Sequence, residues 1–208
     1  MNLNYSLKLI IMANKLKIIQ DSHPESPREW DNLGTMAYKH RNYSLGEEEI
    51  DDPIEWLEEK LNLQPKHKYT NERLEELEEL FFSEYIALPL YLYDHSGITM
   101  ATTPFSCRWD SGKVGYIYVS KAKVREEYNW KVITAKRRET IERYLLGEVE
   151  TFDQYIRGDI YGFEVVDENG EHVDSCWGFY GQDWENNGIK DHIDEELWSQ
   201  LKDIEVEY

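Results

Sequence analysis

Two strand-like runs flank an Asn-Gly dipeptide in the C-terminal part of the sequence. The runs cover residues 160–166 and 173–179, and Asn169-Gly170 lies between them. Asn-Gly between β-branched and aromatic runs is the strongest short-range hairpin signal, because both residues tolerate the positive φ angles of a tight turn. The sequence therefore predicts an antiparallel pair of strands here, and any fold for this chain must contain it.

The rest of the sequence mixes strand-like and helix-like patterns without regular alternation. Further strands are predicted at residues 15–20, 85–93, 98–104 and 114–119. Helices are predicted at residues 53–61, 70–81, 120–128, 134–147, 148–157 and 191–201, and residues 21–46 are predicted to be a long loop. This irregular order is typical of an α+β fold with a mainly antiparallel sheet, hairpins and several flanking helices.

A chain of 208 residues has the length of one domain. We expect a single α+β domain over residues 12–208, preceded by a start-site extension or loose arm over residues 1–11, because Met12 is a second possible start. No run approaches the roughly 20 apolar residues of a membrane span, so no membrane partner is expected. Only Cys107 and Cys176 occur, which indicates a reduced, cytoplasmic protein.

Charge is the most informative feature for function. The net charge is −19, which disfavours direct binding to a nucleic-acid backbone. Acids outnumber bases fourteen to four in residues 46–84 and eighteen to three in residues 148–208, whereas bases prevail eight to four in residues 121–143. The acidic blocks are either solvated faces that keep the protein soluble or a surface presented to a basic partner.

The predicted helix at residues 70–81 carries the acidic surface that we expect to bind. Carboxylates on successive helical turns lie about 5–6 Å apart, a spacing comparable with that of phosphates along a DNA strand. Such a face can occupy a nucleic-acid channel by mimicry, and reversal of three of its charges should abolish binding. The expected binding residues on this helix are Glu72, Glu75, Glu76, Glu78 and Glu79.

An EF-hand-like spacing near the C-terminus suggests calcium as the only candidate cofactor. Oxygen-bearing side chains follow the spacing of a calcium loop, and Gly188 stands where that loop turns sharply. The last position is Asp instead of the longer Glu, and an ordinary turn that precedes a helix cap explains the same residues. The candidate ligands are Asp183, Glu185, Asn187, Asp191 and Asp194.

The sequence also contains weak candidates for catalysis and for a partner contact. Asp94 and His95 lie in a predicted turn, while Cys176 lies in a strand pattern that favours a packed thiol. An enzyme of unknown reaction would place its polar site near Trp30, Asp94, His95 and Asp110. Trp30 itself is either a buried anchor for its loop or, together with Arg28, a contact for a partner.

Several longer motifs resemble an uncharacterised family of acidic proteins encoded by bacteriophages and mobile elements. They are SPREWDNLGTM at residues 26–36, LYLYDHSG at 90–97, the run at 109–119 and DSCWGFYG at 174–181. The likeness covers most of residues 13–181 and carries no catalytic residues over, because the family has no established activity. It implies a setting in which small acidic phage proteins bind and disable host enzymes.

The residues and the resemblance together predict a non-enzymatic protein in the host cytoplasm. Its expected partner is a host protein with a basic surface, such as a restriction or CRISPR nuclease or another nucleic-acid-processing enzyme. The alternatives are the enzyme described above and a structural module that binds calcium.

Overall fold

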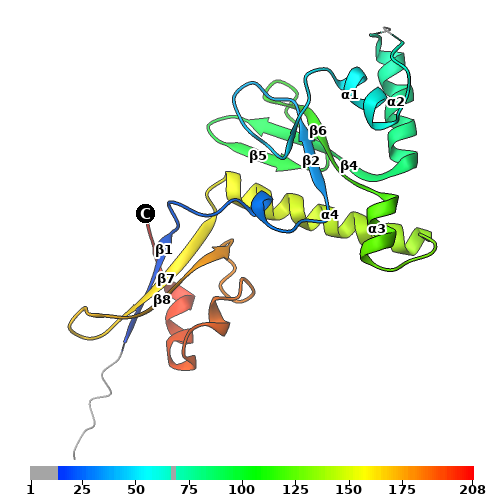
Figure 1. The fold of residues 1–208 in the computed structure, drawn as a ribbon. Helices are drawn as coiled ribbons and strands as arrows, with labels where there is room; N and C mark the ends of the chain where they lie inside the picture. The colour runs from blue at the N-terminus through cyan, green and yellow to red at the C-terminus, as the bar shows by residue number, and fades with distance from the viewer. Residues whose placement is uncertain (1–13, 67–68) are drawn as a thin grey trace, which may run out of the picture. The chain divides into compact units, whose positions relative to one another are not determined.

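The computed structural model describes residues 14–66 and 69–208 and divides into two compact units (Figure 1). We name residues 14–25 together with Gly158–Tyr208 the terminal unit, and Ser26–Arg157 the central unit. Each has its own sheet and hydrophobic core, and the predicted α+β class is confirmed. The sequence had indicated one domain over 12–208. The predicted arm at residues 1–11 lies outside the described residues.

A five-stranded sheet forms the middle of the central unit, in the order β3-β2-β6-β4-β5. Its neighbours are antiparallel except for β2 and β3, which are parallel. The strands are β2 (Thr35–Tyr38), β3 (Glu48–Glu49), β4 (Tyr85–Asp94), β5 (Ile98–Ala101) and β6 (Ser111–Ser120). The long central strand β6 organises both faces, because its side chains alternate between them.

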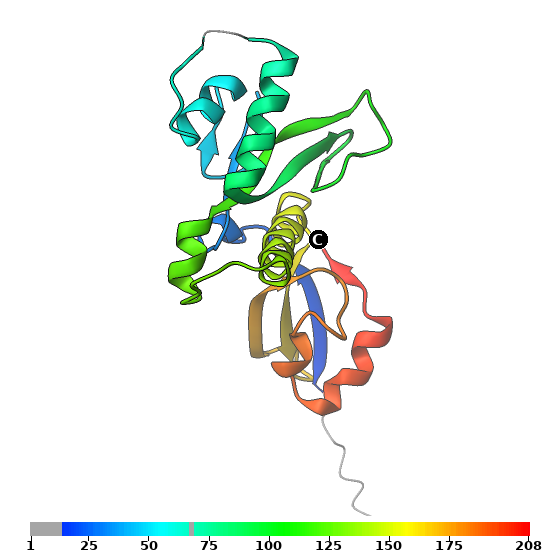
Figure 2. The same cartoon turned by 90° about the vertical axis from the view of Figure 1, so that its right-hand side faces the viewer.

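Helices cover both faces of this sheet (Figure 2). Helices α1 (Pro53–Lys60) and α2 (Asn71–Glu84) pack on the face that carries Tyr116 and Tyr118. Helix α4 (Ala135–Ile156) packs on the opposite face, where Ile117 lies, and the short helix α3 (Lys121–Glu127) connects β6 to it. The core therefore has two parts, one on each side of β6.

Helix α4 is continuous, and the prediction of two helices separated at Gly147 is wrong. Buried Ile141, Leu145, Val149 and Phe152 form one apolar stripe that passes across the glycine. Gly147 costs a helix only about 1 kcal/mol relative to alanine, so packing of the stripe against the sheet outweighs it. The predicted loop over residues 21–46 likewise contains a short helix, η1 (Pro27–Glu29), and strand β2.

The terminal unit contains a four-stranded sheet in the order β8-β7-β1-β9. Strands β1 (Lys15–Gln20) and β7 (Ile160–Val166) are antiparallel, and the 3-10 segments η2 (Ile189–Asp191) and η3 (Glu195–Asp203) pack on one face. Strand β8 (His172–Tyr180) forms the predicted hairpin with β7, whereas β9 (Val206–Glu207) is a short edge strand.

The hairpin turn differs in detail from a two-residue Asn-Gly turn. Of its residues only Gly170 has a positive φ, of 82°. The Asp167 carboxylate accepts hydrogen bonds from the backbone N–H groups of Asn169 and Glu171, both at 2.8 Å. These bonds, that from Glu171 above all, lower the pKa of Asp167.

In the part of the chain that the structure covers, no helix is both long enough and apolar enough to cross a membrane.

Candidate functional site

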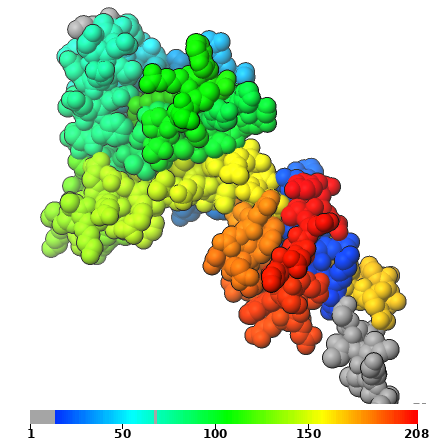
Figure 3. Space-filling model, turned by 180° about the vertical axis from the view of Figure 1, so that it is seen from behind, coloured from blue at the N-terminus to red at the C-terminus, as the bar shows by residue number. Residues whose placement is uncertain are grey.

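The outer side of α2 carries a row of carboxylates. Thr70 begins the helix by accepting a hydrogen bond from the Arg73 N–H, and Leu77 and Phe81 fix its inner side in the core. Spacings of three and four residues then place the remaining charged side chains on one exposed side. We name this row the acidic stripe, and it consists of Glu72, Glu75, Glu76 and Glu79. Figure 3 shows the atoms of α2, in teal, at the surface.

Glu78, the fifth residue predicted for this face, lies beside the stripe and is only partly exposed. Its carboxylate accepts a hydrogen bond from the Tyr116 hydroxyl at 2.6 Å and forms an ion pair with Lys113 at 2.7 Å. The Lys113 ammonium also lies 4.3 Å from the centre of the Tyr116 ring. Glu78 therefore connects α2 to β6, and its charge is compensated within the chain.

Arg73 is the one basic residue of α2, and it points inward. Its guanidinium forms an ion pair with Glu58 of α1 at 2.7 Å and a longer one with Glu76 at 3.3 Å. The hydrogen bonds that Arg73 donates to Glu58 are the main cause that raises the pKa of Arg73. On its own helix the stripe therefore has one base, which points inward and contacts the stripe only at Glu76.

This arrangement lowers the stability of α2. Like charges three or four residues apart destabilise a helix by about 0.2–0.5 kcal/mol per pair. No base in the last turn offsets the helix dipole, and Glu79 and Glu84 add negative charge toward that end. Repulsion between neighbouring carboxylates of the stripe therefore costs α2 some of its stability.

Arg28, predicted to bind a partner, lies in a network inside the central unit. Its side chain is 7% exposed and forms ion pairs with Glu47 and with Glu148 of α4 at 2.9 Å. A further hydrogen bond joins Arg28 to the carbonyl oxygen of Gly34 at 2.8 Å. The same loop presents Trp30, which is 46% exposed. Arg28 therefore holds the loop, while the indole is accessible at the surface.

The structure brings together three of the four residues predicted for an enzyme site. His95 Nδ1 lies 3.5 Å from Asp110 Oδ2, and the Asp94 N–H donates to the Asp110 carbonyl oxygen at 2.8 Å. The thiol of Cys107 also donates to the same carboxylate at 3.4 Å. The carboxylate, rather than the imidazole, contacts the thiol, so the arrangement differs from a nucleophile activated by histidine.

The other two residues considered for catalysis lie elsewhere. Trp30 belongs to the loop held by Glu148, and Cys176 lies in β8 of the terminal unit, opposite Phe163 and against its core. Cys107 and Cys176 are both free thiols. Asp94 lines a cavity of about 570 Å³ together with His40 and Arg41, and His95 and Asp110 are not among the residues that line it.

The candidate calcium loop directs its polar groups to neighbouring backbone and side chains. Asp183 accepts from the Glu185 N–H, Asn187 bonds to Gly181 and Ile189, and Glu185 forms an ion pair with Lys190. Strand β8 precedes the loop and 3-10 segments follow it, in place of the two helices of an EF-hand. Over residues 14–66 and 69–208 no group of three metal-ligating side chains is arranged to hold an ion. Calcium binding by Asp183, Glu185, Asn187, Asp191 and Asp194 stays a prediction.

A polar cluster also joins α1 to the sheet, and it was not predicted from the sequence. The Tyr118 hydroxyl donates to the Glu48 carboxylate at 3.0 Å, and Lys60 Nζ lies 2.9 Å from the same group. Trp56 adds an indole N–H at 3.3 Å. Burial is the main cause that raises the pKa of Tyr118 to about 12. The members of this cluster lie up to 70 residues apart, so no local pattern in the sequence connects them. The aromatic content of β6 was the only signal of the cluster in the sequence.

We expect the contribution of Tyr118 to stability to be lost in strongly alkaline solution. A folded-state pKa of about 12, above the usual tyrosine value of about 10, means that folding favours the neutral hydroxyl. The contribution is therefore complete below about pH 10 and declines as the pH rises toward about 12. Tyrosinate absorbance measured against pH should lose a late-titrating step in Tyr118→Phe and keep it in Tyr144→Phe, whose ring is exposed. Ionisation of Tyr118 together with the exposed tyrosines would contradict this assignment.

Comparison with known proteins found no family model, no curated protein and no solved structure that matches this chain. The resemblance to acidic phage and mobile-element proteins therefore stays a prediction.

Proposed function

We propose that the protein binds and inhibits a host protein by presenting the acidic stripe of α2 to a basic surface. The observation that carries this proposal is the charge arrangement of the helix. Four carboxylates share its exposed side, while its single base is buried against Glu58. Such a surface attracts a cationic partner and repels nucleic acid, so it fits a protein target rather than a DNA one.

The target that suits this surface is an enzyme whose own substrate is a polyanion. A nuclease or another nucleic-acid-processing enzyme has a cationic channel, and a helix with carboxylates on successive turns can occupy it as a DNA mimic. An anti-restriction or anti-CRISPR role in the cytoplasm of a phage-infected cell is the setting that we propose. The resemblance noted for residues 26–36 supports this setting.

Charge reversal on the stripe should remove binding without unfolding the protein. We expect the triple variant Glu72→Lys, Glu75→Lys and Glu79→Lys to weaken partner binding by roughly 100-fold or more, because like charges would then face each other. All three side chains are exposed, so the core beneath α2 stays intact. The assay captures host proteins on the tagged chain, elutes them in steps of increasing salt and identifies them by mass spectrometry.

A matched control separates the stripe from overall charge. Glu168→Lys, Glu195→Lys and Glu196→Lys change the net charge by the same amount at exposed positions of the terminal unit. This control should retain the partner, and the bound enzyme should be inhibited by the parent chain and not by the stripe variant. Equal loss of binding in both triple variants, or retention in both, would refute the assignment to α2.

A further inference from the structure

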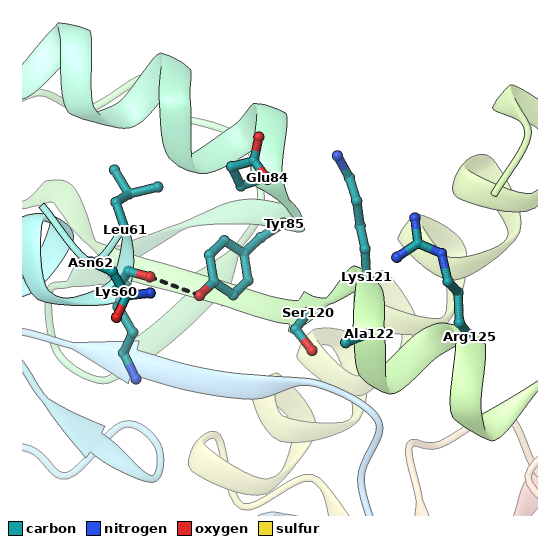
Figure 4. Close-up of a pocket in the computed structure, with 9 residues that line it drawn as sticks. All are labelled: Lys60, Leu61, Asn62, Glu84, Tyr85, Ser120, Lys121, Ala122 and Arg125. Atoms are coloured by element: carbon teal, nitrogen blue, oxygen red, sulfur yellow. Dashed lines mark hydrogen bonds between the residues drawn. The ribbon is translucent and has the colours of Figure 1, made fainter. Parts of the chain in front are cut away.

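A cavity of about 510 Å³ opens in the central unit where α1, α2 and α3 approach one another (Figure 4). The Tyr85 hydroxyl donates a hydrogen bond to the Lys60 carbonyl oxygen at 2.9 Å, which fixes one wall. Leu61 and Ala122 contribute apolar surface, and the rim is polar. This volume is within the range of small-molecule sites and exceeds what a single inorganic ion needs.

Two cationic side chains of α3 reach this cavity. Lys121 and Arg125 are four residues apart and therefore share one side of the helix, and Figure 4 shows both projecting to the same side. The Arg125 side chain is exposed and forms no hydrogen bond or ion pair with any residue that the structure describes. Lys121 donates to the carbonyl oxygen of Ser83.

The remaining charges do not cancel this pair. The Lys60 ammonium is already bound to Glu48, which does not line the cavity, so Lys60 is compensated on its own. Glu84 is the one acidic side chain on the rim, and it makes no ion pair with a described residue. Lys121 and Arg125 therefore face a cavity in which a single carboxylate opposes them.

The position of these cations is unfavourable without a ligand. The first turn of α3 carries Lys121 and Lys123 and no acid, whereas α1 and α2 each carry a glutamate in the first turn. Like charges on one helix side repel, and cations early in a helix oppose its dipole. The chain has 42 acids and only 23 bases, so two neighbouring cations at an electrostatically unfavourable position are unexpected. This unfavourable placement indicates a site for an anion.

We propose that the cavity binds a phosphate monoester of about nucleotide size. The planar guanidinium of Arg125 offers two parallel N–H donors to phosphate oxygens, and Lys121 supplies a second positive charge. The partly exposed ring of Tyr85 and the side chain of Leu61 form an apolar wall for the rest of the ligand. Glu84 weakens anion binding and so limits affinity. This site is separate from the acidic stripe and does not depend on the proposed function.

Calorimetric titration of the full chain at low ionic strength tests the site. The probes are inorganic phosphate, adenosine monophosphate and adenosine. We expect the monophosphate to bind more tightly than phosphate and adenosine not to bind. Arg125→Gln should weaken monophosphate binding about tenfold or more through loss of the charge-assisted bonds of the guanidinium, and Glu84→Gln should strengthen it severalfold. The opposite signs of these two variants cannot arise from a merely structural role.

Lys136→Gln is the matched control, because it removes one exposed positive charge that does not line the cavity. It should leave monophosphate affinity unchanged. Absence of binding by phosphate and monophosphate up to about 10 mM, a concentration that detects even millimolar affinity, would overturn the proposal. So would equal weakening by Lys136→Gln and Arg125→Gln, or adenosine binding as tight as that of the monophosphate.

Discussion

Replacement of Glu58 with alanine should destabilise the central unit by about 3 kcal/mol. The side chains of Glu58 and Arg73 are 4% and 5% exposed, and their ion pair is 2.7 Å long. Removal of the carboxylate leaves a buried guanidinium whose one other acidic partner among the described residues is Glu76, which is 65% exposed. Such an uncompensated buried charge is far more costly than the loss of a surface pair.

Urea unfolding, followed for the transition of the central unit, measures this effect. Glu59→Ala is the matched control, since the next residue of α1 is exposed and should change stability by less than about 0.5 kcal/mol. The double variant Glu58→Leu with Arg73→Met should recover most of the loss, because apolar residues of similar volume can replace a buried pair. Equal stabilities of Glu58→Ala and Glu59→Ala would show that the pair does not anchor α2.

Replacement of Glu148 with alanine should cost the same unit about 2–4 kcal/mol. One oxygen of this carboxylate accepts from the backbone N–H groups of Leu33 and Gly34 at 3.0 and 3.1 Å, and the other binds Arg28. The Glu148 side chain is 15% exposed, so water replaces these contacts only in part. Loss of the carboxylate deprives two backbone donors and Nη1 of the buried Arg28 guanidinium of their acceptor.

The same unfolding measurement applies, with Glu150→Ala as an exposed control on the same helix. The stability of Glu148→Gln should lie between those of Glu148→Ala and Glu150→Ala. The amide oxygen of glutamine still accepts the hydrogen bonds from the backbone, but the ion pair with Arg28 is lost. Limited proteolysis should cut within residues 26–36 first in Glu148→Ala. A Glu148→Ala variant as stable as Glu150→Ala would mean that Arg28 and Glu47 hold the loop alone.

Local signals in the sequence predicted several elements well. Asp52, Thr70 and Ser120 cap α1, α2 and α3, respectively. A short polar side chain can accept hydrogen bonds from the first free N–H groups of a helix, and this capping does not depend on the rest of the fold. The position of the acidic stripe followed from helical spacing for the same reason. These features depend on neighbours within a few residues, which the sequence contains directly.

Features that depend on distant partners could not be predicted in this way. Strand β2 has four residues and little strand character of its own, and it exists because it pairs with β6 some eighty residues later. Glu78 has the same helical surroundings as Glu79, yet contacts with Lys113 and Tyr116 turn it inward. Glu148 lies 120 residues from Arg28, and no pattern in the sequence connects them.

The order of the strands in the terminal unit has a consequence for biosynthesis. Strand β1 pairs with β7, while the whole central unit lies between them in the sequence. During translation β1 therefore emerges first but must wait for some 140 residues before its partner strand leaves the ribosome. The central unit, which is contiguous, can fold during that interval. A folded central unit shortens the effective loop that must close before β1 can pair with β7. Early folding of the central unit should therefore speed the assembly of the terminal unit.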